Sequence, residues 1–595
     1  MKTTVIRRTE FATTFDDVYL LIKPYSALGL KAKRGFVPFG SDDVKKAEFY
    51  YKRLDLIMEA IRRTEFATTS RLEIGTTSRL EIGTTSRLEI GTTNINIIGS
   101  QLQCFEDICE TVKQGLIRPY EMHELHEIKH FVYHYRSLCK SKIFGDVDSD
   151  CTLGDISVCP VISGDVEIAP TIRRTEFATT RSLDDIFKLL DIDGQNTASF
   201  YISTRYSVRF KKIKNEIMKL QIDRERLLCL NKQNIIKKLN LTKFEDVLTV
   251  SRMNTQQIQE LVNSDYFYIE DENFANITLR VKKPLEVLKL EEKINALNRD
   301  LETKAALIRE KLTESIVKRI DDILLALEEV GCFDLLFTKA VFAIQNQCVI
   351  PKILSGKSKV YFEGTNVFNI TLKNELDKLN INYQKIDLKL SKHVNIITGA
   401  NMGGKTWILK TIGQIAYMAK LGLPVPAESI SVRLFDNVFF SGVMTQEDRT
   451  DLSSFGQEII NLIDVLKTAG ANMFLSDEFG RGTNPTEGQA LFNAVMSYFL
   501  QQKNTLVVAT THYQPTLNKT NYTHFQMKGL NQAFINELKK NNTFNLVDKI
   551  KIINKYMDYQ PIETGKDSEL QKSALQIADM LGLNKEIVEE AKKRL

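Results

Sequence analysis

The sequence predicts a multidomain protein in which an α-helical core with long, coiled-coil-like helices precedes an α/β domain and a helical C-terminal segment. Three observations predict this fold class. The chain has 595 residues, which is too many for a single hydrophobic core. Apolar residues recur at steps of three and four from Val287 to Leu327, as they do on a long helix. After Pro351, short apolar runs alternate with helical stretches, which is typical of a largely parallel, helix-covered sheet.

Changes in these patterns set the expected domain boundaries. We expect a helical core over 1–200, long lever or clamp helices and a return to the core over 201–345, the α/β domain over 346–545, and a closing helical segment over 546–595. Within these regions, helical periodicity covers 42–62, 102–138 and 207–238, and a β-like segment covers 266–281. The long helix after it begins behind Pro284, a residue that favours helix starts.

Exact repeats interrupt the N-terminal region. IRRTEFATT occurs three times and SRLEIGTT three times in tandem, so that repeats occupy 6–14, 61–93 and 172–180. Units of eight or nine residues are too short to form a supersecondary unit, unlike those of repeat architectures. We therefore expect inserted, poorly ordered loops at these positions.

Bulk composition excludes few functions. Hydrophobic residues make up 43% of the chain and charged residues 26%, and the net charge is +5. This balance neither requires nor excludes nucleic acid as a partner. The eight cysteines form no C-x-x-C pair, and the first residues lack a secretory signal, which favours a cytoplasmic protein with reduced thiols. The most apolar stretch, Ile323 to Ile344, contains charged residues and predicts a buried helix instead of a membrane span.

A glycine-rich loop follows the apolar strand 394–398. Its pattern, Gly-x4-Gly-Lys-Thr, matches the phosphate loop (P-loop), in which backbone N–H groups and a helix N-terminus surround phosphate oxygens. Lys405 would reach the β- and γ-phosphates of ATP, and the Thr406 hydroxyl would bind Mg²⁺. The candidate cofactor-binding residues are Gly399, Ala400, Asn401, Met402, Gly403, Gly404, Lys405, Thr406 and the adjoining Trp407.

Two acids end another apolar strand, 72 residues after Lys405. Asp477 would hold Mg²⁺, and Glu478 would polarise the attacking water as a general base. His512 follows the strand that contains 505–509, where it could sense the γ-phosphate. These residues predict ATP hydrolysis, with Lys405, Glu478 and His512 as the catalytic candidates.

The motifs together resemble the ATPase domain of the MutS family. The resemblance is carried by TGANMGGKT, FLSDEFGRGTNPTEG and ATTHY, and by Leu452–Glu458, which is similar to the family's Ser-Thr-Phe-x-x-Glu stretch. The resemblance implies an ABC-type ATPase domain and a homodimer with two composite sites, in which Ser453 touches the nucleotide of the partner subunit. It also implies that 573–588, within the closing segment, helps the chain to dimerise.

Two departures from the family affect the predicted role. None of the 32 phenylalanines begins the Phe-x-Glu motif that mismatch sensors of the family use, so we expect no mismatch-reading domain. The variant segment Gly482–Gly488 resembles short relatives that are associated with reactivation of lysine or ornithine aminomutases. The resemblance therefore leaves three hypotheses: an ATP-dependent clamp on duplex DNA, an ATPase that remodels a cobalamin-dependent aminomutase, and a nucleotide-dependent structural dimer.

Two further features bear on these hypotheses. A basic cluster, Arg209, Lys211, Lys212 and Lys214 with Lys237 and Lys238, offers phosphate contacts, although such clusters are commonly solvated faces. His126-Glu127-Ile128-Lys129-His130 fits the H-E-x-x-H pattern of zinc proteases, but no glycine and third histidine follow at the spacing of the longer motif. We interpret this second run as an ordinary helix face.

Overall fold

The structure is a computed structural model that describes residues 18–73, 95–141, 182–239, 245–379, 381–399, 404–442, 454–518, 520–530, 557–564, 575, 578 and 583–593. The chain divides into two compact units. The first combines 1–106, 138–180 and 327–595, and the second combines 107–137 and 181–326. The four domains expected from the sequence, with their boundaries, stay predictions.

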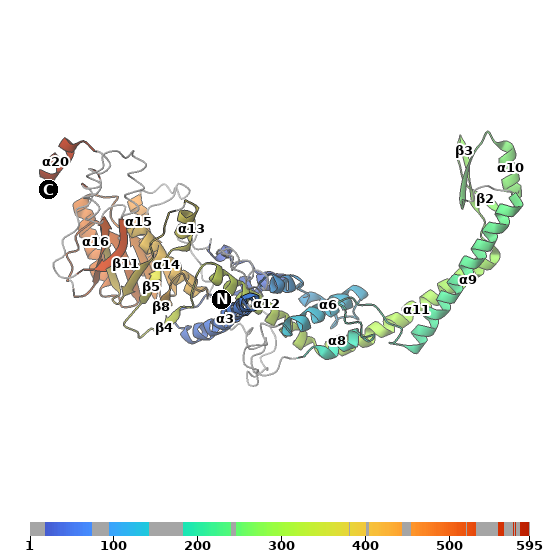
Figure 1. The fold of residues 1–595 in the computed structure, drawn as a ribbon, viewed down its shortest axis with the longest axis horizontal. Coiled ribbons are helices and arrows are strands. Elements are labelled where there is room, and N and C mark those ends of the chain that lie inside the picture. The colour runs from blue at the N-terminus through green and yellow to red at the C-terminus, as the bar shows by residue number, and fades with distance from the viewer. Residues whose placement is uncertain are drawn as a thin grey trace. The chain divides into compact units, whose positions relative to one another are not determined.

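The first unit contains a six-stranded sheet in the order β13-β12-β7-β11-β10-β9, with all strands parallel except β13. Every residue of β7, β10 and β11 is buried, which explains why these strands are mostly apolar in the sequence. Figure 1 shows this sheet in the yellow-to-red part of the chain. The strands are β7 (Val394–Thr398), β9 (Asn437–Ser441), β10 (Asn472–Asp477), β11 (Thr505–Thr511), β12 (Thr523–Leu530) and β13 (Met557–Glu563).

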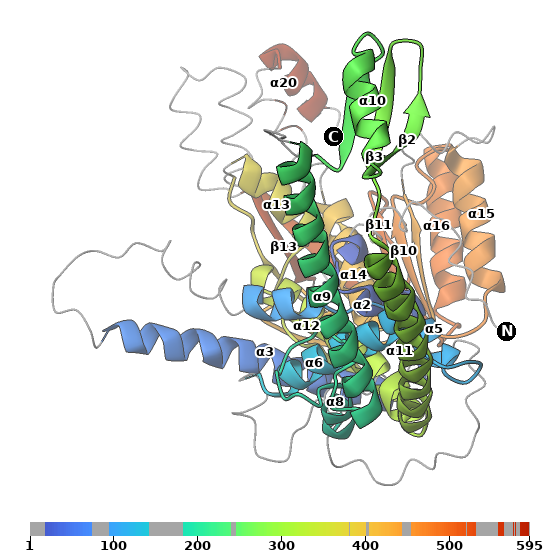
Figure 2. The same cartoon turned by 90° about the vertical axis from the view of Figure 1, so that its right-hand side faces the viewer.

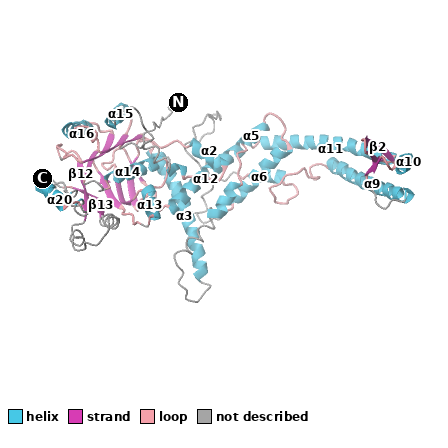
Figure 3. Ribbon diagram, turned by 90° about the horizontal axis from the view of Figure 1, so that it is seen from above, coloured by secondary structure: helices cyan, strands magenta, loops and turns pink. Residues whose placement is uncertain are grey.

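Helices cover this sheet. The helix α14 (Lys405–Lys420) packs against β10 and β11, and it buries Ile408, Leu409 and Ile412. The helices α15 (Ser454–Lys467) and α16 (Pro485–Phe499) enclose a separate cluster with Phe474 and Val507 of the sheet. Figure 2 shows α15 and α16 side by side along β10 and β11, and Figure 3 shows the strands in magenta among these helices.

A smaller mixed sheet in the same unit has the order β4-β8-β5-β6. Its strand β5 pairs antiparallel with both β6 and β8, whereas β4 and β8 are parallel. The strands are β4 (Lys352–Leu354), β5 (Phe362–Val367), β6 (Ile386–Leu390) and β8 (Ser429–Arg433), with α13 (Ile370–Lys378) between β5 and β6. At the C-terminal end, the structure describes α20 (Lys585–Lys593), and the predicted role of this end in dimerisation stays a prediction.

The C-terminal end of α14 is fixed by buried side chains from two other helices of the first unit, α3 (Val44–Glu73) and α12 (Ile320–Gln345). The Tyr51 hydroxyl lies 2.9 Å from the carbonyl oxygen of Ala419 and 3.1 Å from that of Leu423. The Lys339 ammonium donates to the carbonyl oxygen of Leu421 at 2.8 Å and lies 3.9 Å from the centre of the Phe36 ring. These contacts supply buried hydrogen-bond donors to carbonyl groups in the last turn of α14 and just beyond its end.

We expect Tyr51→Phe to lower the free energy of unfolding by about 1–2 kcal/mol, because buried carbonyl groups lose a donor. Thermal unfolding monitored by circular dichroism would measure the change. Tyr498→Phe is the matched control, since Tyr498 is 48% exposed and its hydroxyl can be replaced by water. Equal unfolding temperatures for the two variants would show that the Tyr51 hydroxyl does not stabilise this helix end.

A second buried contact joins α12 to the beginning of the described chain. The Asp334 carboxylate, which is fully buried, accepts hydrogen bonds from the backbone N–H groups of Tyr25 and Ser26 and from the Ser26 hydroxyl. Ser26 is also the N-cap of α2 (Ala27–Gly35). The pKa of Asp334 is raised, because burial raises it more than these hydrogen bonds lower it. The polar group is therefore buried with its partners supplied.

The second unit is built around two long helices, α9 (Val208–Leu239) and α11 (Leu285–Val317). They pack through Ile213, Ile217 and Ile294, as the periodicity predicts. Figure 1 shows them side by side up to a small antiparallel sheet of β1 (Val247–Ser251), β3 (Asn276–Val281) and β2 (Phe267–Glu272), accompanied by α10 (Thr255–Asn263). The remaining helices here are α5 (Cys109–Gln114), α6 (Met122–Cys139) and α8 (Asp184–Leu190), and whether the long pair is a true coiled coil stays a prediction.

Three sequence predictions require correction. The helix expected over 102–138 is divided into α5 and α6, because Gly115 and Pro119 lie between them. The long helix expected through Leu327 ends at Val317, and α12 begins at Ile320, where Arg319 pairs with Asp322 and Asp185. The repeat at 61–69, expected to be a loop, continues α3 to Glu73, since no glycine or proline precedes Gly75.

Other predictions about these regions have different outcomes. The repeats at 6–14 and 172–180 lie outside the described residues, and so do residues 74–93 of the repeat region 61–93. The apolar stretch 323–344 is a buried helix within α12, as predicted. Among the residues that the structure describes, no helix is both long enough and apolar enough to cross a bilayer.

Candidate nucleotide-binding site

The phosphate-loop sequence lies where the sheet can present it. It follows β7, a strand between β11 and β12, and it precedes α14. Gly399 and Gly404 have φ angles of 152° and 82°, and a Cβ atom on either would lie 2.8 Å from Met527 or Tyr559. Both positions therefore require glycine. Ala400, Asn401, Met402 and Gly403, which the sequence also assigns to this loop, lie outside the described residues.

Lys405 is the first residue of α14 and its side chain is only 4% exposed. Its ammonium donates to the carbonyl oxygen of Gly399 at 2.8 Å and lies 3.7 Å from Glu478 Oε1. Burial lowers the pKa of Lys405, and the nearby carboxylates partly oppose that shift. The charge thus stands at the helix N-terminus, where an anion would also be stabilised by the exposed backbone N–H groups.

Thr406 and Asp477 form an oxygen-rich pair beside Lys405. The Thr406 hydroxyl donates to Asp477 Oδ2 at 2.7 Å, although β10 and α14 are far apart in sequence. A hydroxyl and a carboxylate are the hard oxygen donors that Mg²⁺ prefers, so this donor set fits the predicted ion. Asp477 is buried, with 7% of its surface exposed.

Glu478 follows Asp477 and adopts a left-handed backbone conformation, with φ at 54°. Its carboxylate lies 2.6 Å from His512 Nε2 and 2.6 Å from an Arg481 guanidinium nitrogen. The hydrogen bond with His512 is the main cause that lowers the pKa of Glu478 to about 2, and the charges of His512, Lys405 and Arg481 add to it. Positive φ at a non-glycine residue is characteristic of constrained functional sites.

The structure therefore brings together most of the predicted site residues, Gly399, Gly404, Lys405, Thr406, Asp477, Glu478 and His512. Trp407 lies one residue further along α14, half-buried, with the Lys410 ammonium 5.0 Å from its ring centre. Ser453 lies outside the described residues, so its predicted contact with a partner's nucleotide stays a prediction.

Sequence reasoning missed several neighbours of this site. Arg481 and Thr510 both stand inside quoted motifs, but nothing in a single sequence shows that they contact the two acids. Gly480 is held from two sides: Glu458 Oε2 accepts from its N–H at 2.8 Å, and the Tyr513 hydroxyl donates to its carbonyl oxygen at 3.1 Å. Three separate motifs thus meet in the loop after Glu478.

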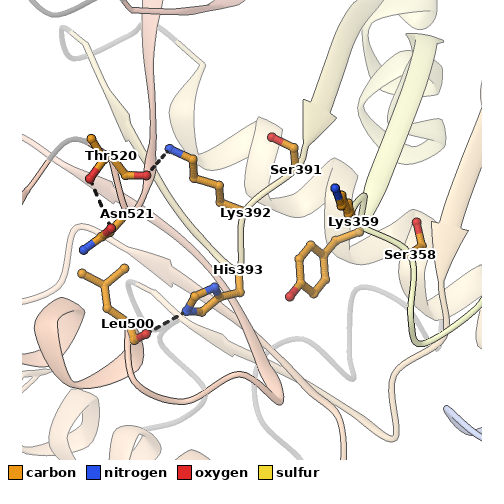
Figure 4. A pocket seen from close by; sticks show the side chains of 9 residues that line it. Ser358, Lys359, Ser391, Lys392, His393, Leu500, Thr520 and Asn521 are labelled. Atoms are coloured by element: carbon orange, nitrogen blue, oxygen red, sulfur yellow. Dashed lines mark hydrogen bonds between the residues drawn. The ribbon is translucent and has the colours of Figure 1, made fainter.

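Two alternative sites receive little support from the geometry. In the H-E-x-x-H run, His126 Nδ1 accepts from the backbone N–H of Phe200 at 3.2 Å, and Glu127 accepts from the Thr111 hydroxyl at 2.7 Å. Figure 4 shows an open pocket lined by Lys392, His393 and other residues. The Lys392 ammonium there already donates to backbone carbonyl oxygens of Thr520 and Tyr522.

Part of this chain is similar to known proteins. Residues 395–595 match the model of MutS domain V. Proteins named Endonuclease MutS2 are similar over parts of the chain: the one from Fusobacterium nucleatum is 31% identical over 39% of this chain and 29% of its own length. The protein from Clostridium tetani is 29% identical over 55% of this chain and 38% of its own length. The protein from Staphylococcus carnosus is 32% identical over 43% of this chain and 32% of its own length.

The matches cover about a third of each of these three relatives, with shares of 29%, 38% and 32%. Their names assign an endonuclease activity to those proteins, and these partial matches do not extend that activity to this chain. None of the three names mentions an aminomutase, so the comparisons do not favour the reactivation alternative.

Proposed function

We propose that this chain is a MutS-family ATPase whose nucleotide cycle controls binding to duplex DNA, a proposal supported by the match of residues 395–595 to the model of MutS domain V. The observation that supports this proposal most strongly is the cluster of Lys405, Thr406, Asp477, Glu478 and His512 at the carboxyl edge of the six-stranded sheet. This edge is where parallel α/β sheets bind their ligands.

Each side chain of the cluster has a role that its chemistry supports. Lys405 and the N-terminus of α14 bind the β- and γ-phosphates of ATP, and Thr406 and Asp477 would hold Mg²⁺, which would neutralise charge on the phosphate oxygens. Glu478 accepts a proton from the attacking water, and His512, 2.6 Å from it, positions its carboxylate near the γ-phosphate.

Glu478 contacts Lys405, Arg481 and His512, and its pKa is about 2. A carboxylate with so low a pKa is a weak base. Phosphate oxygens would compete for Lys405, so that nucleotide binding would weaken one of the charge interactions that lower this pKa, while the hydrogen bond with His512, the main cause, would remain. In the proposed cycle, Ser453 of each subunit of a homodimer completes the site of its partner, and ATP binding closes the clamp.

The basic helix α9 supports DNA as the partner of this cycle. It carries ten Lys or Arg residues and three Asp or Glu residues. Arg209, Lys211, Lys212 and Lys214 are exposed, while Phe210 and Ile213 between them are buried, so that the charges face solvent. Lysine and arginine side chains on an exposed helix face bind phosphates with little dependence on base sequence.

We expect Lys211→Ala, Lys212→Ala and Lys214→Ala, combined in one variant, to weaken DNA binding at low salt. The slope of log K against log salt should fall by about 0.9 for each phosphate that the variant no longer neutralises. Fluorescence anisotropy of a labelled duplex, titrated with salt in the presence and absence of ATP, would measure both effects.

The matched control replaces three exposed lysines of α3, Lys45, Lys46 and Lys52, and removes the same charge. It should leave the salt slope nearly unchanged. If the wild-type chain binds no DNA at low salt, or if the two triple variants lose affinity equally, DNA binding through α9 is wrong.

A further inference from the structure

Thr510 joins the two acids of the candidate site through one buried hydroxyl. It lies in β11, directly opposite Asp477 of β10 in the parallel ladder, and it is completely buried. Its hydroxyl donates to Asp477 Oδ1 at 2.6 Å and accepts from the backbone N–H of Glu478 at 3.0 Å. The hydroxyl therefore donates its single proton to the Asp477 carboxylate and accepts a hydrogen bond from the Glu478 backbone.

The two oxygens of Asp477 consequently have different partners. Oδ1 accepts from Thr510, and Oδ2 accepts from Thr406, 2.7 Å away. A carboxylate held at only one oxygen can rotate about its terminal torsion, because such torsions are broad. The hydrogen bond from Thr510 fixes that rotation and turns Oδ2 towards α14.

The same hydroxyl supports the unusual backbone at Glu478. The Glu478 N–H is shared between the hydroxyl and the carbonyl oxygen of Thr510, at 3.0 and 3.2 Å. The residue has a φ of 54°, a conformation that costs free energy for a side chain with a Cβ atom. Two acceptors on one donor help to maintain this conformation and so direct the Glu478 side chain to His512 and Lys405.

We infer that Thr510 is a positioning residue that orients Asp477 for the metal ion and Glu478 for the attacking water. This inference rests on the proposed ATPase function. Threonine suits the position because its hydroxyl both donates and accepts, and its branched Cβ restricts χ1. Valine has nearly the same shape and the same branched Cβ, but it can neither donate nor accept a hydrogen bond.

We expect Thr510→Val to lower kcat for ATP about 10- to 100-fold and to raise the Mg²⁺ concentration required for half-maximal turnover by a similar factor, as for other residues that orient metal ligands. Binding of ADP without Mg²⁺ should change less than about 2-fold, since Lys405 and the glycine loop are untouched. The fluorescence of Trp407, the single tryptophan, would report ADP binding with and without Mg²⁺. Thr510→Ser, which keeps the hydroxyl, should restore most of the turnover and the Mg²⁺ affinity.

Thr523→Val is the matched control. Thr523 is a threonine of β12, a strand of the same sheet that β7 separates from β11. It is 1% exposed, and its hydroxyl has no hydrogen-bond partner among the described residues. Its replacement should leave turnover and Mg²⁺ dependence at the wild-type level. If Thr510→Val does not fold, Thr510→Ala against Thr510→Ser tests the same hydroxyl.

Different results overturn different statements. Wild-type turnover and Mg²⁺ dependence in Thr510→Val, or equal losses in Thr510→Val and Thr510→Ser, would overturn the positioning role alone. Loss of Mg²⁺-free ADP binding in Thr510→Val would also overturn it, because the residue would then act on the whole loop. A wild-type chain that neither binds nor hydrolyses ATP would overturn the proposed function and this inference together.

Discussion

A Lys405→Ala variant should lose ATP binding by at least about 100-fold, which corresponds to about 3 kcal/mol of binding free energy. The deleted ammonium is the only side-chain cation placed both at the N-terminus of α14 and within 4 Å of Glu478 Oε1 among the described lysines. Charge-assisted hydrogen bonds to phosphate are among the strongest in proteins, and a buried site offers little water to replace them. A titration of Trp407 fluorescence with ATP would measure the loss.

The control for this variant is Lys389→Ala. Lys389 lies in β6 and pairs with Glu363 on the surface, where its side chain is 57% exposed. The same loss of charge there should leave nucleotide affinity unchanged. Normal hydrolysis by Lys405→Ala would contradict the assignment of the phosphate loop itself.

Glu478→Gln should bind ATP and hydrolyse it about 100- to 10,000-fold more slowly, since a neutral amide cannot accept the proton of water. Affinity for nucleotide should be equal or higher, because the variant removes the carboxylate that competes with phosphate for Lys405. Single-turnover hydrolysis, together with equilibrium binding, separates these two effects.

Glu487→Gln provides the comparison for this variant. Glu487 stands nine residues later, is exposed in the first turn of α16, and loses the same charge. It should turn over ATP at the wild-type rate. Undiminished turnover in Glu478→Gln would exclude its role as the base.

Much of the α/β unit could be predicted from the sequence because its signals are local. The strands at 394–398, 472–477 and 505–511 are buried on both faces, so that each appears as a short, mostly apolar run. The phosphate loop and the two acids each stand at the end of such a strand. Their meeting at one edge of the sheet then follows from the parallel pairing of β10 with β11 and of β11 with β7.

Other features depend on contacts that periodicity does not record. The break between α11 and α12 is accompanied by ion pairs of Arg319 with Asp322 and Asp185, a residue 134 positions away. The hydroxyl of Thr510 meets Asp477 across 33 positions, and only the register of two strands determines that contact. At 61–69 the structure has a helix where a loop was expected. A repeated sequence does not by itself prevent a helix when it contains no glycine or proline to end it.

The anchoring of α14 has a mechanical consequence. At its C-terminal end, Tyr51 of α3 donates a hydrogen bond to the carbonyl oxygen of Ala419, and Lys339 of α12 donates one to that of Leu421, just past the helix. At its other end, Lys405 and Thr406 contact a carbonyl group and a side chain of the proposed site. One end of α14 is anchored, and the other carries the residues that we propose to bind phosphate. If the first turn moves when nucleotide binds, we expect the contacts of Tyr51 and Lys339 to resist that movement at the other end of the helix.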